Sequence, residues 1–309
     1  MLRSLFLWLS EQASIFTFVK RNRLARRIAS RFVAGETVDS AIEATRLLNE
    51  KGITASLDLL GESVSSKEET YLARDEVVQT LDAVARTGVD ANVSVKLTQL
   101  GLDIDYDLCL QNIRLILARA KEHDIFVRMD MESSDHTDRT LRIFKDVHPE
   151  FGNLTGVVIQ SYLRRSSADT ECLIAMGARV RLCKGAYAEP ELVAYQEKQE
   201  IDTSFDHLMT RLLDEGNYPG IATHDEQRIE RTLAHVQGKK IPYERFEFQM
   251  LYGVRRDLYQ SLKDRGFNVR VYIPFGSNWY PYLMRRLAER PGNIAFMTAS
   301  IMKETLSRS

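Results

Sequence analysis

The sequence is poor in the residues that build disulfide-linked, collagen-like or disordered chains. Its 309 residues include only three Cys, seven Pro and sixteen Gly, and the cysteines form no Cys-X-X-Cys pair. Neither a disulfide framework nor a cysteine zinc site is indicated, so a reducing cytoplasm is the default compartment. With 44% hydrophobic residues and no low-complexity run, the chain is expected to fold around a large core.

Several common functional motifs are also absent. No Gly-X-Gly-X-X-Gly follows a candidate strand and no Gly-X4-Gly-Lys-Ser/Thr occurs, so neither a Rossmann dinucleotide site nor a P-loop is indicated. The six His show neither His-X-His nor His-Glu-X-X-His spacing, which argues against a metal site. A net charge of -1 argues against a protein whose whole surface binds nucleic acid.

Positive charge is concentrated at the N-terminus. Residues 1–31 contain seven basic residues and one acidic residue, a net charge of +6, and apolar residues interrupt the basic run at helical spacing. The apolar run from Leu5 to Leu9 is too short to span a bilayer and resembles no signal peptide. Two interpretations stay open: a helix resting on the anionic inner face of the cell membrane, or the solvated face of an ordinary packed helix.

Along the rest of the chain, eight short apolar or β-branched runs alternate with stretches of helical periodicity. The runs are Ile53–Leu59, Ala91–Leu97, Ile125–Met131, Val157–Tyr162, Ala178–Cys183, Gly220–Thr223, Phe246–Leu251 and Val269–Ile273. The helical stretches are Ser66–Arg86, Leu108–His123, Thr137–Val147, Glu191–Leu213, Glu226–Val236, Asp257–Arg265 and Tyr280–Glu289, with a capping box expected between Ser66 and Glu69. Eight such units predict a (β/α)8 barrel over residues 51–309, after a helical extension over residues 1–50.

Polar side chains stand where these runs end. In (β/α)8 barrels the chemistry lies at the C-terminal ends of the strands, so these residues are expected at one rim. They are Asp58, Lys96, Asp130, Gln160, Arg181 with Lys184, Thr223 with His224, Gln249 and Tyr272. Strand ends can also be polar simply because they are exposed to solvent. Polar residues at the ends of all eight runs nevertheless favour a functional site at this rim.

Six segments together resemble one enzyme family. They are Val95-Lys96-Leu97, Arg181-Leu182-Cys183-Lys184-Gly185-Ala186-Tyr187, Ala222-Thr223-His224, Phe248-Gln249-Met250-Leu251-Tyr252-Gly253, Val271-Tyr272-Ile273-Pro274-Phe275-Gly276 and Tyr282-Leu283-Met284-Arg285-Arg286-Leu287. In this order and spacing, over residues 50 to 300, they resemble the FAD-dependent proline dehydrogenases, and the length is similar to that of the short monofunctional bacterial members. The resemblance implies oxidation of L-proline to 1-pyrroline-5-carboxylate, the first step of proline degradation to glutamate. It also implies FAD as cofactor and a membrane quinone as electron acceptor.

The resemblance implies a substrate site near the last barrel helix, which crosses the barrel mouth in this family. Planar guanidinium groups bind both oxygens of a carboxylate, so Arg285 and Arg286 would hold the proline carboxylate, with charge added by Lys96. The ring would be walled by Tyr272, Tyr282 and Leu251. One departure is a ten-residue step from Tyr272 to Tyr282, two residues shorter than in long family members, so no roles are transferred to Ser277, Asn278 or Trp279.

The flavin and catalytic roles are implied in the same way. Arg181 would lie near the reactive nitrogen of the flavin, where a fixed cation stabilises the reduced ring. Asp130 would position or gate the site and contact the cofactor, and Gln160 would bond the pyrimidine edge. Tyr187 would be a catalytic residue together with Lys96, Asp130 and Arg181. The remaining FAD contacts would come from Lys184, Gly185, Ala186, Thr223 and His224. No residue is an evident base for the substrate amine.

Two alternatives of other classes remain. A Schiff-base aldolase or lyase on the same barrel would use Lys96 or Lys184 as its amine nucleophile. A membrane-surface adaptor without catalysis would function through the basic N-terminus. A purified protein without flavin absorbance would favour the adaptor, and borohydride trapping would identify the Schiff-base enzyme.

Overall fold

The computed structural model describes residues 29–61 and 64–289, and the side chains of residues 285–289 lie outside the described part. Eight parallel strands form a closed barrel in chain order, because β1 pairs with both β2 and β8. They are β1 (Thr54–Leu59), β2 (Ala91–Val95), β3 (Val127–Met129), β4 (Thr155–Gln160), β5 (Arg179–Cys183), β6 (Gly220–Ala222), β7 (Glu247–Leu251) and β8 (Val269–Phe275). Each overlaps one of the eight predicted runs, which confirms the barrel.

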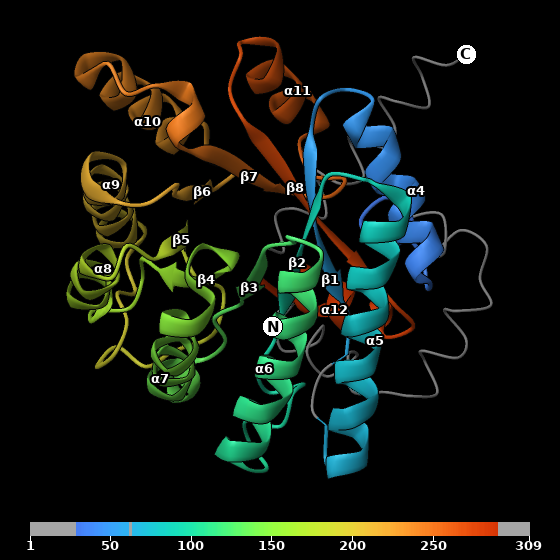
Figure 1. Cartoon of the computed structure of the whole chain (residues 1–309). Helices are drawn as coiled ribbons and strands as arrows, with labels where there is room; N and C mark the ends of the chain where they lie inside the picture. The colour runs from blue at the N-terminus through green and yellow to red at the C-terminus, as the bar shows by residue number, and fades with distance from the viewer. Residues whose placement is uncertain (1–28, 62–63, 290–309) are drawn as a thin grey trace.

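Helices surround the strands (Figure 1). They are α4 (Val38–Asn49), α5 (Lys67–Thr87), α6 (Tyr106–Glu122), α7 (Ser134–Phe151), α8 (Ser166–Ala175), α9 (Lys198–Glu215), α10 (Glu226–Lys239), α11 (Arg256–Asp264) and α12 (Trp279–Glu289). Within the described ranges, none of these helices combines the length and apolar character needed to cross a bilayer.

Two details of the helix prediction are wrong. Helix α8 is absent from the predicted stretches, because Leu173 is the only apolar residue among its three buried positions. The next predicted helix begins at Glu191, whereas α9 begins at Lys198. The intervening chain instead forms a turn after Pro190 and an antiparallel bridge between Ala194 and Leu163.

The expected capping box at the start of α5 forms only in part. The Ser66 hydroxyl accepts from the Glu69 backbone N–H at 3.2 Å, as expected for an N-cap. The Glu69 carboxylate, however, accepts from the backbone N–H of Ser65 at 2.6 Å, one residue before the N-cap. The return bond is therefore displaced by one residue.

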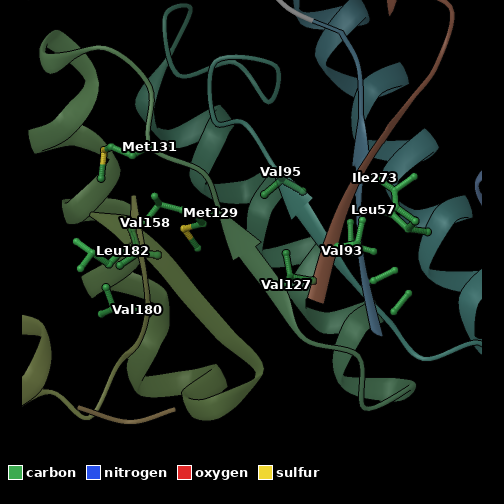
Figure 2. Close-up of a cluster of buried hydrophobic side chains, with 14 of the residues drawn as sticks. Leu57, Val93, Val95, Val127, Met129, Met131, Val158, Val180, Leu182 and Ile273 are labelled. Atoms are coloured by element: carbon green, nitrogen blue, oxygen red, sulfur yellow. The ribbon is translucent and has the colours of Figure 1, made fainter. Parts of the chain in front are cut away.

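Alternation along the strands separates an apolar outer layer from a polar interior. Leu57, Val93 and Ile273 belong to the main hydrophobic core, which also contains Leu81 of α5 and Ile113 of α6 (Figure 2). The core therefore lies between strands and helices. Successive side chains of a strand point to opposite faces, so the residues between these apolar positions face the barrel interior.

The interior residues are hydrogen-bonded across the barrel. Ser56 of β1 lies 3.1 Å from Ser94 of β2, and Arg181 of β5 donates to both Ser94 and Gln249 of β7. Gly220 of β6 leaves room for this network, since a Cβ there would lie 2.4 Å from the Gln249 side-chain nitrogen. Polar pairs thus fill a space that apolar side chains occupy in many (β/α)8 barrels.

Helix α12 lies at the C-terminal end of the barrel, as predicted (Figure 1). Its Tyr280 and Leu283 are buried in a small cluster with Leu60, which follows β1, and with Phe32. The Trp279 indole N–H also donates to Glu36 at 3.0 Å. The segment just before α4 therefore holds α12 in place.

The N-terminal segment is described only from Ala29. Gly253 has a φ of +76°, and a Cβ there would lie 1.8 Å from the Arg31 carbonyl oxygen, so this approach of the two backbones requires glycine. Ala29 and Phe32 are buried against α12. Most of the basic segment, residues 1–28, lies outside the described residues, so its expected contact with a membrane stays a prediction.

Candidate active site

Arg181 occupies the centre of the C-terminal half of the barrel. Its Nη1 donates to Asp130 Oδ1 at 2.7 Å and its Nε donates to Gln249 Oε1 at 2.5 Å. The guanidinium carbon lies 5.0 Å from the centre of the Tyr272 ring, a distance typical of a cation–π contact. Because its neighbours come from several strands, the orientation of this buried cation depends on barrel closure.

Asp130 joins Arg181 to Tyr272. The Tyr272 hydroxyl donates to Asp130 Oδ2 at 2.6 Å, while Arg181 uses the other carboxylate oxygen. Burial raises the pKa of Tyr272 well above its usual value, and the negative charges of Asp130 and Asp58 add to the effect. Tyr272 therefore stays a neutral donor at any physiological pH.

Lys96 forms an ion pair beside this network. Its ammonium lies 2.6 Å from Asp58 Oδ1, and both side chains are nearly buried. Burial raises the pKa of Asp58, although the opposing charge of Lys96 lowers it in part. Asp58 Oδ2 is buried, and no hydrogen-bond partner for it stands among the described residues.

A second ion pair lies one layer below. Arg270 donates to both oxygens of Glu247 at 2.9 and 3.0 Å and to the Ala55 carbonyl at 2.7 Å. Burial alone would raise the pKa of Glu247, but Arg270 and the other donors outweigh it and hold the pKa below its usual value. Glu247 also accepts from Gln249, which accepts from Arg181. Hydrogen bonds thus connect the two layers.

The loop after β5 carries several residues expected to bind FAD. Lys184 forms ion pairs with Asp202 at 2.5 Å and with Asp225 at 2.6 Å. Gly185 has a φ of +102°, a conformation that favours glycine, and Ala186 and Tyr187 are exposed. The loop therefore presents backbone to solvent, while the Lys184 charge is already paired.

The residues expected after β6 support the neighbouring strand. His224 Nε2 accepts from the Leu251 backbone N–H at 3.0 Å. The buried Thr223 hydroxyl accepts from the Asp225 backbone N–H at 3.1 Å. Leu251 of β7 is paired with Tyr272 of β8. His224, Leu251 and Tyr272 therefore follow one another along this part of the rim.

Gln160 offers the clearest position for a cofactor. The side chain is buried, and its amide nitrogen donates at 3.3 Å to the carbonyl oxygens of Met131 and Glu132. Its Oε1 is buried, and the described part of the chain supplies no hydrogen-bond partner for it. A buried acceptor without a donor is costly, so the residues present fit a ligand that brings an N–H to this point, as the pyrimidine ring of a flavin does.

The remaining predicted substrate residues lie on or beside α12. Tyr282 is buried near the end of β1, in the cluster that contains Leu60. Arg285 and Arg286 belong to the same helix, but their side chains lie outside the described part. Their predicted contact with a carboxylate stays a prediction.

Three interior residues were not among the predicted rim residues: Ser56, Ser94 and Glu247. The sequence contains a signal for all three, because they stand two residues before the polar positions Asp58, Lys96 and Gln249. A period of two places such residues on one face of a strand. Extending the polar pattern one step back along each strand would have found them.

Comparison with known proteins gives the family. A family model for proline dehydrogenase matches residues 41–299. The chain is 40% identical over 306 residues to proline dehydrogenase 1 of Bacillus subtilis (strain 168), covering 98% of this chain and 100% of that protein. It is 42% identical over 280 residues to the proline dehydrogenase of Deinococcus radiodurans, covering 89% of this chain and 90% of that protein.

A solved structure agrees with both findings. The crystal structure of proline utilization A (PutA) from Bdellovibrio bacteriovorus inactivated by N-propargylglycine is similar with a TM-score of 0.80 and 27% identity. The match covers 85% of this chain and 32% of that one. On the family model, the relatives and the closed barrel together, this chain belongs to the proline dehydrogenase family, whose reaction is the oxidation of proline.

Proposed function

We propose that this protein oxidises L-proline to 1-pyrroline-5-carboxylate, with FAD as hydride acceptor and a membrane quinone as the final acceptor of the electrons. The observation that carries the proposal is Arg181, a buried cation fixed by Asp130, Gln249 and Tyr272 at the C-terminal end of the barrel. The chain belongs to a family that oxidises proline, and the catalytic groups of (β/α)8 barrels lie at this end of the strands. We therefore expect the cofactor and the substrate to bind next to Arg181.

The residues present fit FAD. Gln160 Oε1 would accept from the pyrimidine edge, because it is a buried acceptor for which residues 29–61 and 64–289 offer no donor. The loop at the half-buried Gly185 and the exposed Ala186, with Thr223 and His224, would hold the remainder of the cofactor. When bound, FAD supplies an electrophilic ring nitrogen that takes a hydride from a substrate carbon. Arg181 would stabilise the negative charge that reduction places on the ring.

The protein's own part is to bind and orient proline. Lys96 contributes positive charge near the substrate carboxylate, and Arg285 and Arg286 provide forks that bond both carboxylate oxygens. The Tyr272 ring contacts the Arg181 guanidinium, and its hydroxyl donates a hydrogen bond to Asp130. These two contacts fix the ring, which would form one wall of the site for the pyrrolidine ring. Tyr282 and Leu251 extend that wall.

The Schiff-base alternative agrees poorly with the geometry. Lys96 is ion-paired with Asp58, and Lys184 is ion-paired with Asp202 and Asp225. A Schiff-base nucleophile must be a neutral amine, whereas both lysines serve here as cations in ion pairs. Borohydride treatment with a carbonyl substrate should therefore trap no covalent adduct on either lysine.

An absorbance spectrum tests the proposed function. The purified protein should show the two visible bands of an oxidised flavin, and anaerobic L-proline should bleach them. D-alanine, which lacks the ring, serves as the control and should leave the spectrum unchanged. A colourless protein that binds no added FAD would exclude the proposed cofactor, and a flavin that proline fails to reduce would exclude the proposed substrate.

A further inference from the structure

A pocket opens at the end of the barrel opposite Arg181 and Asp130. It has a volume of about 680 Å³ and is lined by segments that precede β2, β3 and β4 and by Arg179 and Arg270 near the starts of β5 and β8. The volume is in the range of small-molecule sites. Because the strands are parallel, this pocket is separated from the proposed active site by the length of the barrel.

Arg179 has no polar partner in the described part of the structure. Its side chain forms no hydrogen bond or ion pair there, and its Nε is buried without a partner. The guanidinium carbon lies 4.2 Å from the centre of the Phe126 ring and 4.8 Å from that of Tyr218. Aromatic contacts of this kind restrain the guanidinium while leaving its N–H donors unused.

Charge in this half of the barrel is unbalanced. Arg128, Arg179 and Arg270 lie near one interior carboxylate, Glu247, which already accepts from Arg270, Gln249 and Tyr218. Among the described residues, Arg128 donates only to the backbone carbonyls of Val157 and Arg179. Burial lowers the pKa of Arg179, and Glu247 offsets this only in part. The interior therefore has more positive charge than it neutralises.

The other charged groups on the pocket do not supply a partner. Asp90 and Asp124 line it but are exposed, and neither forms an ion pair with Arg179 in the described residues. His123 is bonded to Asp82. Asn92 is nearly buried and lines the same pocket, so a polar amide is available beside the arginine. The pocket lining thus combines the Asn92 amide with the Arg179 guanidinium, whose side chain has no polar partner in the described residues.

We propose that this pocket is a second binding site, for a small oxyanion such as a carboxylate or a phosphate, held by Arg179. A planar guanidinium bonds two oxygens of such a group at once, and these bonds would use the donors that the protein leaves free. The site is independent of proline oxidation, so its existence does not rest on the proposed function.

Calorimetric titration of the purified protein tests the proposal. Sodium phosphate and sodium acetate are the two probes, and sodium chloride at equal ionic strength is the control for screening. The two probes distinguish a phosphate from a carboxylate as the natural ligand. The titrations are repeated in Arg285→Gln, because an anion could also bind at the proposed substrate site and this variant weakens that site.

At least one probe should bind saturably in Arg285→Gln, and adding Arg179→Gln should weaken that binding at least about tenfold. Arg245→Gln is the matched control, since Arg245 is an exposed cation in the turn before β7 and should leave the affinity unchanged. Equal affinity with and without Arg179, or no saturable binding of either probe, would overturn the proposal.

A second series does not depend on removing a packed side chain. Ala85 is exposed on α5 and lines the pocket, so substitutions there should leave the fold intact. Ala85→Glu should weaken anion binding, Ala85→Lys should strengthen it, and Ala85→Gln should change it least, because only the charge differs among the three. Identical affinities in all three variants would place the bound anion outside this pocket.

Discussion

The hydroxyl of Tyr272 donates to Asp130 Oδ2 at 2.6 Å, while the other oxygen of the same carboxylate accepts from Arg181. One acidic group thereby fixes both an aromatic wall and a cation. Arg181 lies on β5 and Tyr272 on β8, and Asp130 directly follows β3. The three side chains can hold these positions only when the barrel is closed, so the site is specified by the tertiary fold.

Asp130→Asn should disturb this arrangement while leaving the volume of the side chain nearly unchanged. The amide leaves the Arg181 cation without its charge partner, and misplacement of a catalytic group by about 1 Å can cost about a hundredfold in rate. We expect kcat/KM for proline to fall by about that factor, measured by steady-state dye reduction. Asp138→Asn is the control, because Asp138 is 83% exposed in a surface ion pair. Equal losses in both variants would contradict a special role for Asp130.

The barrel was predictable because its strands are locally encoded. β-branched and apolar runs mark all eight strands, and their polar ends correctly place Asp130, Arg181 and Tyr272 at one rim. Helix α8 was missed, because two of its three buried residues, Ser166 and Thr170, are polar. The pairing of Glu247 with Arg270 could not be read from the sequence either, because it depends on which strands become neighbours when the barrel closes.

Arg285→Lys and Arg286→Lys should each raise the KM for proline while flavin content stays normal. A lysine keeps the charge but cannot form two parallel bonds to a carboxylate. Removing such a contact costs about 2 to 4 kcal/mol in kcat/KM. The measurement combines steady-state kinetics with the flavin-to-protein absorbance ratio. An unchanged KM in either variant would remove that arginine from the substrate site.

Glu247→Gln should destabilise the fold and reduce its sensitivity to acid. The pKa of Glu247 lies below its usual value because Arg270 and other donors outweigh the effect of burial. The ionised carboxylate therefore stabilises the folded state above the pKa of the unfolded chain, and this stabilisation is lost as pH falls through the lower folded pKa. Breaking one side of a buried ion pair costs about 3 to 5 kcal/mol.

Urea denaturation measures this effect. At pH 7 the free energy of unfolding should be lower in Glu247→Gln than in the wild type, and the difference should shrink as the pH is lowered below the usual range of glutamate. Glu244→Gln is the control, because Glu244 is an exposed residue of the turn that precedes β7. A constant difference across the acid range would show that Glu247 does not titrate as its surroundings predict.

Deleting residues 1–28 should weaken binding to anionic vesicles and slow quinone reduction more than dye reduction. The segment carries most of the +6 charge of residues 1–31, and a basic helix is attracted to anionic lipid. Vesicle sedimentation and paired quinone and dye assays measure the two effects. If the full chain fails to sediment at low salt, where charges act over about 30 Å, the segment has a structural role instead.

Tyr272 should also determine which ring the site accepts. Its hydroxyl is bonded to Asp130 and its ring faces Arg181, so the ring cannot move aside for a larger substrate. An added hydroxyl on the pyrrolidine ring would overfill the pocket at a cost of about 1 to 3 kcal/mol. At about 1.4 kcal/mol per decade, the kcat/KM for 4-hydroxyproline should be about fivefold to 140-fold lower than that for proline.

Two substitutions separate the ring of Tyr272 from its hydroxyl. Tyr272→Ser removes the wall, which should harm proline oxidation while giving hydroxyproline space and a polar neighbour, so the preference for proline should narrow. Tyr272→Phe keeps the wall and loses only the bond to Asp130, so both substrates should slow in parallel and the preference should persist. The measurement is kcat/KM for both substrates in all three proteins. A preference unchanged in Tyr272→Ser would show that this ring does not contact the substrate, and the alignment leading into Arg285 and Arg286 would lose its support.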